Sequence, residues 1–453
     1  MNKTPLMVSI SGVRGIVGQS LTPDVIVRYA AAFAEYCGRG KIVIGRDGRI
    51  TGKSIGNILS STLISMGCDV IALGVAPTPT IALAVECYGA SGGIAVTASH
   101  NPAEWNGLKF IAGSGMFLNE KENQRLWKIA DSASFTYASW DKLGTHTADD
   151  AFLRRHIDGV LSLPAIQPEL IRARRFRVAA DCINASGSVI VPQILRELGC
   201  DVIGINTDMT GIFSRTPEPV PENLGPLCAC VRENGADFGI AVDPDADRLV
   251  VVTEKGEPLG EEYTITTAVK IILEKEKKKE PVVVVNLSTT RAVDDIASRT
   301  GARVVRTPVG EINVAEKMKE LGAVIGGEGS GGVILPMLHY TRDAIVGIGL
   351  FLQQLAEFDG TLSQFKESLP PYSIVKAKIR IDSVGTIDIF ERLKELYTGR
   401  GAINTEDGLK IDLKDSWIHL RKSNTEPIIR IIAEAVSEEE AKRLIREVQQ
   451  KLT

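Results

Sequence analysis

The chain has 453 residues, of which 44% are hydrophobic and 24% charged, so it has enough apolar material for more than one core. Its 52 basic and 56 acidic residues give a net charge of −4. The chain therefore lacks the excess of positive charge that is typical of nucleic-acid-binding proteins. The longest apolar stretch, around residues 345–352, is far shorter than the ~20 residues of a membrane-spanning helix. We therefore expect a cytoplasmic, water-soluble protein without nucleic-acid or membrane partners.

The seven cysteines form no metal-binding pattern. Their number is odd, and "CAC" at 228–230 is not a C-x-x-C motif. Several lie in apolar surroundings, as reduced core thiols of a cytosolic protein do. The cysteines therefore predict neither a disulfide framework nor a zinc site.

Three segments share one pattern, in which an apolar strand, an amphipathic helix, a glycine and a second strand follow one another. Gly67, Gly199 and Gly301 stand just after the helices, in the position that favours a left-handed residue. Continuous Val/Ile strands separated by helices are typical of parallel sheets covered on both faces. The pattern therefore predicts three related α/β domains. Their strand pairs are 41–47 with 68–74, 177–182 with 200–206, and 282–288 with 302–308.

The C-terminal part of the chain has a different pattern. Four segments alternate like antiparallel strands, and a helix over 437–452 follows, with Ser437 as its N-cap. Residues 367–373, which contain two prolines, predict a linker before it. The four strands are 374–381, 409–414, 417–421 and 428–435.

The whole chain therefore predicts three related α/β domains with mixed, mainly parallel sheets and a smaller C-terminal α+β domain, arranged around a central cleft. The expected bounds are 1–150, 151–255, 256–369 and 370–453.

The first segment with potential chemistry is "TASHNP" at 97–102, which directly follows an apolar strand. Open α/β sheets bind ligands at the carboxyl ends of their strands. Asn101 and Pro102 predict a turn after Ser99, and Lys109 follows. The segment does not match the G-x-S-x-G elbow of hydrolases. Taken alone, it leaves Ser99 open as a nucleophile, a phosphate carrier or a turn residue.

The second segment is "DPDADR" at 243–248, which follows the apolar strand 238–242. Asp243, Asp245 and Asp247 alternate along it, and three close carboxylates repel one another unless a cation neutralises them. Oxygen-only ligands suit a hard cation such as Mg²⁺. An EF-hand is disfavoured, because Arg248 replaces the glycine of that loop and the flanks predict strands. A solvated acidic loop is the alternative.

The third segment is the glycine-rich "GGEGSGG" at 326–332, which we expect to be a loop after a strand at 323–325. Glycines let the backbone approach a ligand. Glu328 and Ser330 offer polar groups for vicinal sugar hydroxyls. The segment matches neither the P-loop nor the dinucleotide-binding pattern.

The fourth segment is "RKSNTEPIIR" at 421–430. Its hydroxyls, turn amides and guanidinium groups predict an anion-binding turn that suits a phosphate, whereas a basic hairpin is the alternative. Together, the four segments offer a hydroxyl, a divalent metal, a sugar contact and a phosphate site, which indicates an enzyme acting on a phosphosugar. The residues predicted to form the anion-binding turn of the fourth segment are Arg421, Lys422, Ser423, Asn424, Thr425 and Arg430.

At this point the chain resembles the α-D-phosphohexomutase family, which includes phosphoglucomutases, phosphomannomutases and phosphoglucosamine mutases. The resemblance covers essentially the whole chain and rests on the four segments in the family's order. "SGVRG" at 11–15 is similar to the family's N-terminal arginine segment, although F-G-T-x-G-x-R-G is more usual there. It assigns the active-site arginine to Arg14.

The resemblance implies an isomerase that interconverts hexose 1-phosphate and hexose 6-phosphate through a 1,6-bisphosphate, with hexose 1,6-bisphosphate as activator. Ser99 would carry the phosphate and, with the three aspartates, bind Mg²⁺. Arg14, Lys109 and Arg248 would supply positive charge. His100, as a group that titrates near neutrality, would assist proton transfer, or it is a buried structural histidine. Glu328 and Ser330 would bind the sugar, and the fourth segment would bind the phosphate that is not reacting.

One position departs from the family's pattern. Gly332 stands where G-E-x-S-G-H has its histidine, which removes one possible substrate contact. We favour glucosamine phosphate as substrate, with mannose and glucose phosphates open, and expect a monomer or homodimer. The competing functions are a metal-dependent sugar phosphatase and a non-catalytic sugar-phosphate-binding protein.

Overall fold

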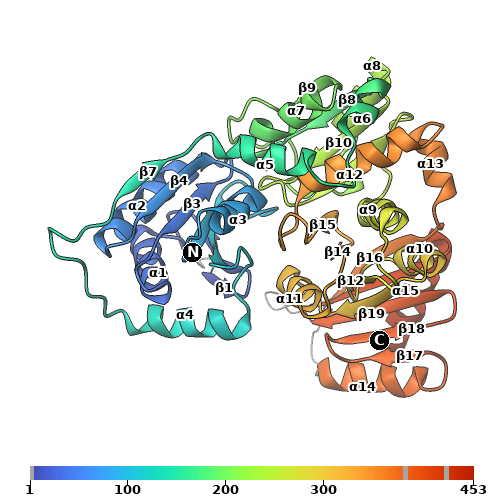
Figure 1. Cartoon of the computed structure of the whole chain (residues 1–453). Coiled ribbons are helices and arrows are strands. Elements are labelled where there is room, and N and C mark those ends of the chain that lie inside the picture. The colour runs from blue at the N-terminus through green and yellow to red at the C-terminus, as the bar shows by residue number, and fades with distance from the viewer. Residues whose placement is uncertain (1–4, 381–385, 423–427, 453) are drawn as a thin grey trace.

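The computed structural model describes residues 5–380, 386–422 and 428–452. In this part of the chain, the strands form four separate sheets of seven, four, four and five strands, one after another along the chain. Figure 1 shows the first sheet with its helices on the left, the second at the top, and the third and fourth on the right, coloured from blue to red along the chain. The predicted architecture of three α/β units and a C-terminal α+β unit is confirmed.

The first unit is a seven-stranded sheet with helices on both faces. Its strands are β1 (Met7–Ser9), β2 (Gly12–Ile16), β3 (Ile42–Arg46), β4 (Val70–Val75), β5 (Gly92–Val96), β6 (Trp105–Ala112) and β7 (His146–Ala148). Its helices are α1 (Pro23–Tyr36), α2 (Gly52–Ser65), α3 (Thr78–Cys87) and α4 (Glu120–Ser132). The strand order is β1-β2-β6-β5-β3-β4-β7, and β5, β3, β4 and β7 run parallel. One hydrophobic cluster joins α1, α2 and α4 to the sheet, and another joins α3 to it.

The second unit has a four-stranded sheet. Its strands are β8 (Arg177–Asp181), β9 (Asp201–Ile205), β10 (Phe238–Val242) and β11 (Leu249–Thr253), in the order β11-β10-β8-β9. Only β11 runs antiparallel to its neighbour. The helices are α5 (Phe152–Leu161), α6 (Pro168–Arg174), α7 (Gly187–Glu197) and α8 (Gly225–Asn234), with the short 3₁₀ helix η1 (Pro221–Asn223) before α8.

The third unit repeats this plan. Its strands are β12 (Val282–Asn286), β13 (Arg303–Thr307), β14 (Ile325–Glu328) and β15 (Gly332–Ile334), in the order β13-β12-β14-β15, with β15 antiparallel. Its helices are α9 (Glu262–Lys275), α10 (Ala292–Thr300), α11 (Glu311–Leu321), α12 (Ala344–Glu357) and α13 (Leu362–Ser368).

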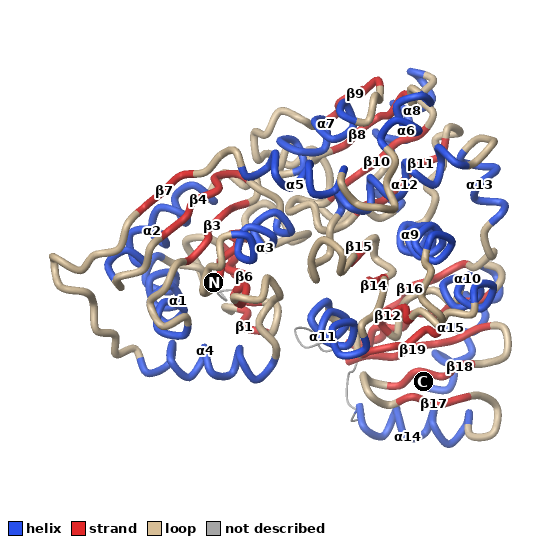
Figure 2. The backbone as a smooth tube through the Cα atoms, in the orientation of Figure 1, coloured by secondary structure: helices blue, strands red, loops and turns tan. Residues whose placement is uncertain are grey.

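The fourth unit is an antiparallel sheet with two helices, α14 (Thr386–Tyr397) and α15 (Glu438–Leu452) (Figure 2). Its strands are β16 (Ser373–Arg380), β17 (Ala402–Asn404), β18 (Leu409–Asp412), β19 (Ser416–Lys422) and β20 (Ile428–Ala435), in the order β16-β20-β19-β18-β17. The four predicted strands and the final helix are confirmed, and the Ser437 hydroxyl accepts a hydrogen bond from the Glu440 N–H at 3.3 Å, as an N-cap does. The sequence patterns had predicted neither α14 nor β17.

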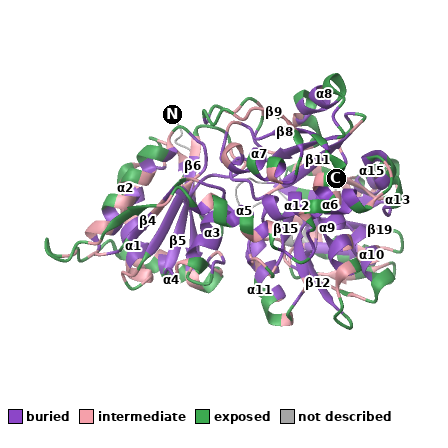
Figure 3. Ribbon diagram, turned by 45° about the horizontal axis from the view of Figure 1, so that its top comes forward, coloured by how far each residue is buried: buried purple, intermediate pink, exposed green. Residues whose placement is uncertain are grey.

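The second and third units share one continuous hydrophobic core. Helix α12 packs on α9 of its own unit and on α5 and α6 of the second unit, and buried residues from Ile157 to Leu369 belong to the same cluster. Figure 3 shows the buried strands and helices of both units in purple, side by side. Side chains contributed by these two units are therefore held in a fixed relative position.

The cysteines and the apolar helices were also the subject of predictions. All seven cysteines are free thiols, as predicted. Among the described residues, no helix combines the length and the apolar character that crossing a membrane requires.

The three repeated strand–helix–strand segments have the predicted geometry. Their strands pair in parallel as β3 with β4, β8 with β9, and β12 with β13. Gly67, Gly199 and Gly301 have φ angles of +89°, +74° and +70°, so each takes the left-handed conformation expected after a helix. A residue with a Cβ is unfavourable there.

Two of these glycines differ in their surroundings, which gives a matched test of that cost. A Cβ at Gly301 meets no atom within 4 Å, whereas a Cβ at Gly199 lies 3.0 Å from the Cα of Arg172. We expect Gly301→Ala to cost about 1 kcal/mol of stability from its backbone conformation alone. Gly199→Ala should cost more, because the backbone of Arg172 must also move. Thermal unfolding midpoints of the two variants measure this, and a larger loss at Gly301 would contradict it.

Candidate active site

The candidate site forms where strand ends from three units meet. Ser99 follows β5, Asp243 follows β10, and Glu328 is the last residue of β14. Ser99 is 2% exposed, and its hydroxyl donates a hydrogen bond to Oδ2 of Asp243 at 3.0 Å, across 144 residues of sequence. The structure therefore brings the predicted phosphate carrier and the predicted metal segment into direct contact.

The three aspartates form a compact buried group. Their ligand atoms lie within 4.8 Å of one another, and all three residues are 0% exposed, so the alternative of a solvated acidic loop is wrong. Oδ1 of Asp245 and Oδ1 of Asp247 are buried without a hydrogen-bond partner. Buried oxygens without partners are costly unless a cation binds them. The donor set therefore fits a hard divalent cation.

Other groups hold the remaining oxygens of this cluster. Lys109 Nζ lies 2.6 Å from Oδ2 of Asp245 and 3.4 Å from Oδ2 of Asp247. The Thr78 hydroxyl, at the first residue of α3, donates to the same Asp245 oxygen at 2.8 Å. The first unit thus supplies both donors to a segment of the second unit.

The pKa values of these carboxyl groups are far from ordinary. Burial, together with the neighbouring Asp247 and Asp245, raises the pKa of Asp243 well above its usual range. Burial acts in the same sense on Asp245, but the charge of Lys109 and the hydrogen bonds that its carboxylate accepts outweigh it, so the pKa of Asp245 is lowered. The cluster therefore carries strong mutual repulsion that a bound cation relieves.

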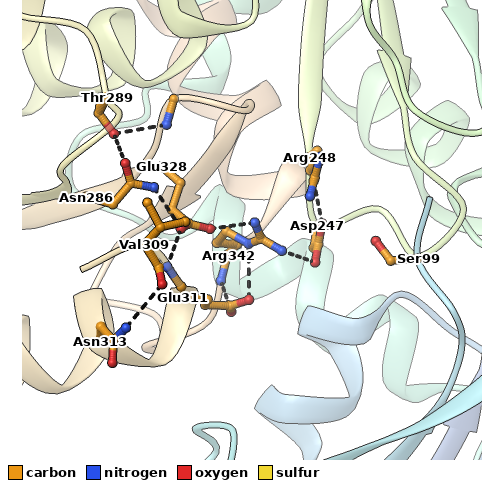
Figure 4. Close-up of polar contacts among 12 residues, drawn as sticks. Ser99, Asp247, Arg248, Asn286, Thr289, Val309, Glu311, Asn313, Glu328 and Arg342 are labelled. Carbon is orange, nitrogen blue, oxygen red and sulfur yellow. Dashed lines mark hydrogen bonds and ion pairs between the residues drawn. The ribbon is translucent and has the colours of Figure 1, made fainter. Parts of the chain in front are cut away.

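Arg342 is the principal site residue that the sequence analysis missed (Figure 4). Its Nη2 lies 2.7 Å from Oδ2 of Asp247, its Nη1 2.7 Å from Oε2 of Glu328, and its Nε 3.1 Å from Oε2 of Glu311. The guanidinium is buried, and these carboxylates raise its pKa although burial opposes that change. Arg342 therefore joins the metal segment to the sugar segment.

Gly332 makes the room that Arg342 needs. A Cβ at Gly332 would lie 2.3 Å from Cδ and 3.0 Å from Cγ of Arg342. Packing thus explains a glycine at this position, because the arginine stem fills the space that a side chain would take.

A pair of buried histidines fixes the segment that carries Arg342. His156 Nε2 and His339 Nε2 lie 2.7 and 2.9 Å from the same oxygen of Asp343, whose other oxygen caps the first turn of α12. The Thr80 hydroxyl lies 2.8 Å from His156 Nδ1, and the Thr341 N–H donates to His339 Nδ1 at 3.2 Å. Both ring nitrogens of His156 and of His339 thus have a hydrogen-bond partner within the protein, so the group needs no metal ion.

The sugar segment is a hairpin rather than the predicted loop after residues 323–325. Strand β14 extends to Glu328, and β15 begins at Gly332. Both oxygens of the Glu328 carboxylate have partners. Oε2 contacts Arg342, and Oε1 accepts hydrogen bonds from Asn286 Nδ2 and the Gly310 N–H at 2.8 and 3.0 Å. Ser330 is half-buried in the turn of the hairpin.

The neighbouring cations lie around the Ser99 turn and the metal segment. Arg14, on β2, donates from Nη1 to Oδ1 of Asn101 at 3.1 Å, and its Nε is buried without a partner. Arg248 has its Nη1 3.4 Å from Glu218 and its Nε 3.8 Å from Oδ1 of Asp247. With Lys109, they place positive charge on several sides of the cluster.

The surroundings of His100 oppose the expectation that it titrates near neutrality. Burial, followed by the charges of Arg248 and Arg14, lowers the pKa of His100 to about 2. Its Nδ1 lies 3.5 Å from the Ser99 hydroxyl. His100 is half-buried rather than fully buried, and its lowered pKa places a neutral imidazole beside the serine.

The phosphate segment is described only at its ends. Arg421 and Lys422 end β19, and Arg430 lies on β20 opposite Arg421. The predicted residues Ser423, Asn424 and Thr425 lie outside the described residues. No hydrogen bond or ion pair within the described ranges joins Arg421, Lys422 or Arg430 to Ser99 or to the three aspartates.

A contact between the third and fourth units supports Arg421. Its Nε lies 2.9 Å from Oδ2 of Asp407, and that oxygen accepts the Val309 N–H at 2.8 Å. His419 lies beside them, with Nε2 2.6 Å from the Asp407 carbonyl and Nδ1 2.9 Å from the Ser288 hydroxyl. Burial lowers the pKa of His419 to about 4.

Comparison with known proteins agrees with this geometry. Models of the phosphoglucomutase/phosphomannomutase alpha/beta/alpha domains I, II and III match residues 7–137, 154–256 and 260–372, and the model of the C-terminal domain matches 377–451. A probable phosphoglucosamine mutase of Methanopyrus kandleri is 36% identical over 439 residues, which are 96% of this chain and 95% of that protein. A phosphoglucomutase/phosphomannomutase of Thermococcus kodakarensis is 37% identical over 441 residues, with 96% and 95% covered.

A solved structure gives the same result. A phosphoglucomutase/phosphomannomutase family protein of Burkholderia thailandensis has a TM-score of 0.85 and 25% identity, with 98% of each chain covered. The chain therefore belongs to the phosphoglucomutase/phosphomannomutase family, and it is a phosphohexomutase, an isomerase of sugar phosphates.

The packing of Gly332 yields a prediction. Gly332→Ala should displace Arg342, so that Glu328 and Asp247 lose their ion pairs with its guanidinium group. This loss should lower kcat by roughly tenfold or more. Removal of a partner from a buried ion pair costs about 3–5 kcal/mol, so the unfolding midpoint should fall as well. Gly56→Ala is the control, because a Cβ there meets no atom within 4 Å. Wild-type kinetics for Gly332→Ala would refute this packing.

The lowered pKa of His419 predicts a pH dependence of stability. The unfolded chain binds a proton below its ordinary value of 6.5, whereas the folded chain resists protonation down to about pH 4. Stability should therefore fall as the pH drops from 6.5 to 4, by at most about 3 kcal/mol from this group. Unfolding midpoints measured across this range should fall less steeply for His419→Gln than for the wild type. Parallel curves would contradict the assignment.

Proposed function

We propose that this phosphohexomutase interconverts the 1-phosphate and the 6-phosphate of a hexose, with Ser99 as the phosphate carrier. The observation that carries the proposal is the 3.0 Å contact between the Ser99 hydroxyl and Asp243, inside a buried group of three aspartates. A phosphate on Ser99 adds about −1.5 to −2 charge at neutral pH. Such a group requires nearby positive charge, and a cation bound at the aspartates would supply part of it.

Asp243, Asp245 and Asp247, with an oxygen of the phosphorylated Ser99, would hold Mg²⁺. The ion supplies Lewis-acid stabilisation of the charge that develops on the phosphoryl oxygens. The two buried oxygens without hydrogen-bond partners support this assignment. A thiolate- or imidazole-binding metal suits these oxygen donors less well.

Arg14, Lys109 and Arg248 would stabilise the phosphoryl group while it moves between Ser99 and the sugar. Phosphoryl transfer depends mainly on positioning and electrostatic stabilisation. The ion pairs of Lys109 and Arg248 with the metal segment support this role, because both cations are already beside the reacting group. His100, as a neutral imidazole, would accept a hydrogen bond rather than carry charge.

The sugar would bind in the expected central cleft among the four units. Glu328 and Ser330 would hold its hydroxyls, and Arg421, Ser423, Asn424, Thr425 and Arg430 would hold the phosphate that is not reacting. The bisphosphate formed in the first transfer would reorient within the site, so that its other phosphate faces Ser99. Ser99 would then take back that phosphate. Added hexose 1,6-bisphosphate would act as activator, because it phosphorylates Ser99.

We infer glucosamine phosphate as the preferred substrate, ahead of mannose and glucose phosphates. The support is the name of the Methanopyrus kandleri relative, together with the Gly332–Arg342 packing that distinguishes this site from one with a histidine. The chain would act in the cytoplasm as a monomer or homodimer. Its four domains, 1–150, 151–255, 256–369 and 370–453, would each carry one site segment, and the residues 367–373 would form a hinge.

Phosphorus NMR tests the proposal. With Mg²⁺ and a trace of glucose 1,6-bisphosphate, the wild type should interconvert the 1- and 6-phosphate signals of glucosamine phosphate. Mannose and glucose phosphates, offered in parallel, should react more slowly. Ser99→Ala should reduce the rate by about 10³-fold or more, because it removes the carrier atom.

The same spectra distinguish the alternative functions. Inorganic phosphate as the sole product, formed equally by Ser99→Ala, would mean a metal-dependent phosphatase. Unchanged substrate signals with retained binding would mean a sugar-phosphate-binding protein. Asp245→Asn serves as a second variant, which should lose Mg²⁺ affinity in calorimetry.

A further inference from the structure

Arg49 occupies an unusual position for a charged residue. It is 1% exposed, and its guanidinium makes four hydrogen bonds. Nη2 donates to the carbonyl oxygens of Ser99 and Asn101 at 2.6 and 2.7 Å, and Nη1 donates to that of Pro102 at 2.7 Å. Nε donates to Oδ2 of Asp47 at 3.0 Å. One side chain from the loop after β3 thus binds three carbonyls of the turn that contains Ser99.

Asp47 extends this contact to the other end of the Ser99 peptide. Its Oδ2 also accepts the Thr97 hydroxyl at 2.7 Å, and its Oδ1 accepts the Arg49 N–H at 2.9 Å. Oγ1 of Thr97 in turn accepts the Ser99 N–H at 2.9 Å. The amide and the carbonyl of Ser99 are therefore both bound, directly or through Thr97, to the Asp47–Arg49 pair.

The turn needs such support because its backbone is unfavourable. Ser99 has a φ angle of +47°, in the left-handed region that side chains with a Cβ rarely adopt. In this conformation the Ser99 hydroxyl donates to Oδ2 of Asp243. A relaxed turn would rotate the hydroxyl away from the metal segment.

The same guanidinium also contacts the second unit. Its central carbon lies 4.7 Å from the ring centroid of Phe213, a cation–π distance. A Cβ at Gly211 of that loop would lie 2.0 Å from the carbonyl oxygen of Gly48. The loop that carries Arg49 is therefore covered by a loop of the second unit, while the guanidinium of Arg49 holds the Ser99 turn.

We propose that Arg49 is a positioning residue for phosphoryl transfer, which fixes the Ser99 turn in its left-handed conformation with the hydroxyl aimed at the metal site. The inference rests on the proposed role of Ser99 as phosphate carrier. Arg49 itself touches neither Ser99 Oγ nor the three aspartates. A lysine cannot replace it, because an ammonium group is a single point of charge and cannot reach three carbonyls and a carboxylate in a fork.

Kinetics of Arg49→Lys test the proposal. Small misplacement of a reacting atom costs about 10²-fold in rate, so kcat should fall by about that factor while KM for the sugar phosphate changes little. Arg46→Lys is the matched control, since Arg46 precedes Asp47 and donates to a single carbonyl, that of Asp47, at 3.2 Å. In Arg49→Ala, added guanidinium ion should restore part of the lost kcat, and sodium chloride at equal ionic strength should not.

Hydrogen exchange of the peptide spanning residues 97–106 tests the same idea without turnover. Exchange should be faster in Arg49→Lys than in the wild type and in Arg46→Lys, with little change elsewhere. Unchanged exchange together with a kcat within twofold of the wild type would overturn the proposal. A fall in kcat accompanied by faster exchange over the whole first unit would also overturn it, because Arg49 would then only stabilise the fold. A wild type without mutase activity would refute the proposed function instead, and the exchange result would still decide the role of Arg49.

Discussion

The rest of the site depends on three carboxylates that lie close together in the protein interior. Asp243, Asp245 and Asp247 repel one another there, and cations that offset this repulsion come from more than one unit. Lys109 comes from the first unit and Arg342 from the third, and both form ion pairs with this segment of the second. The metal segment is therefore the place where three units meet, and the ion pairs of Lys109 and Arg342 tie the first and third units to it.

The surrounding packing makes that arrangement rigid where the chemistry needs it. Asp343, next to Arg342, is held by His156 and His339, so the arginine cannot leave the site without breaking a buried network. The hydroxyl of Thr80 reaches this network from the first unit. Buried polar groups that satisfy one another completely specify a single arrangement, whereas a partly satisfied network would be costly.

The sequence predicted what depends on local pattern. The repeated strand–helix–strand segments, the strands of the fourth unit and the position of the metal segment directly after β10 all follow from periodicity and neighbouring residues. Helix α14 was missed although Ile389, Leu393 and Tyr397 have helical spacing and pack in the core of the fourth unit. Arg342 and Arg49 were missed for a different reason. Each has partners whose proximity only the fold creates, and "TRD" or "DGR" alone carries no signal that distinguishes a site arginine from a surface one.

The shared core of the second and third units has a consequence for how the chain can be divided. The family models end one domain at residue 256 and begin the next at 260, yet helix α12 packs on helices from both sides of that boundary. A fragment cut there would expose the apolar faces of α5 and α6, whereas the fourth unit keeps a hydrophobic cluster of its own. The domains defined by sequence families therefore differ from the cooperative folding unit. In the middle of this protein, the smallest fragment that would fold on its own contains two of those domains.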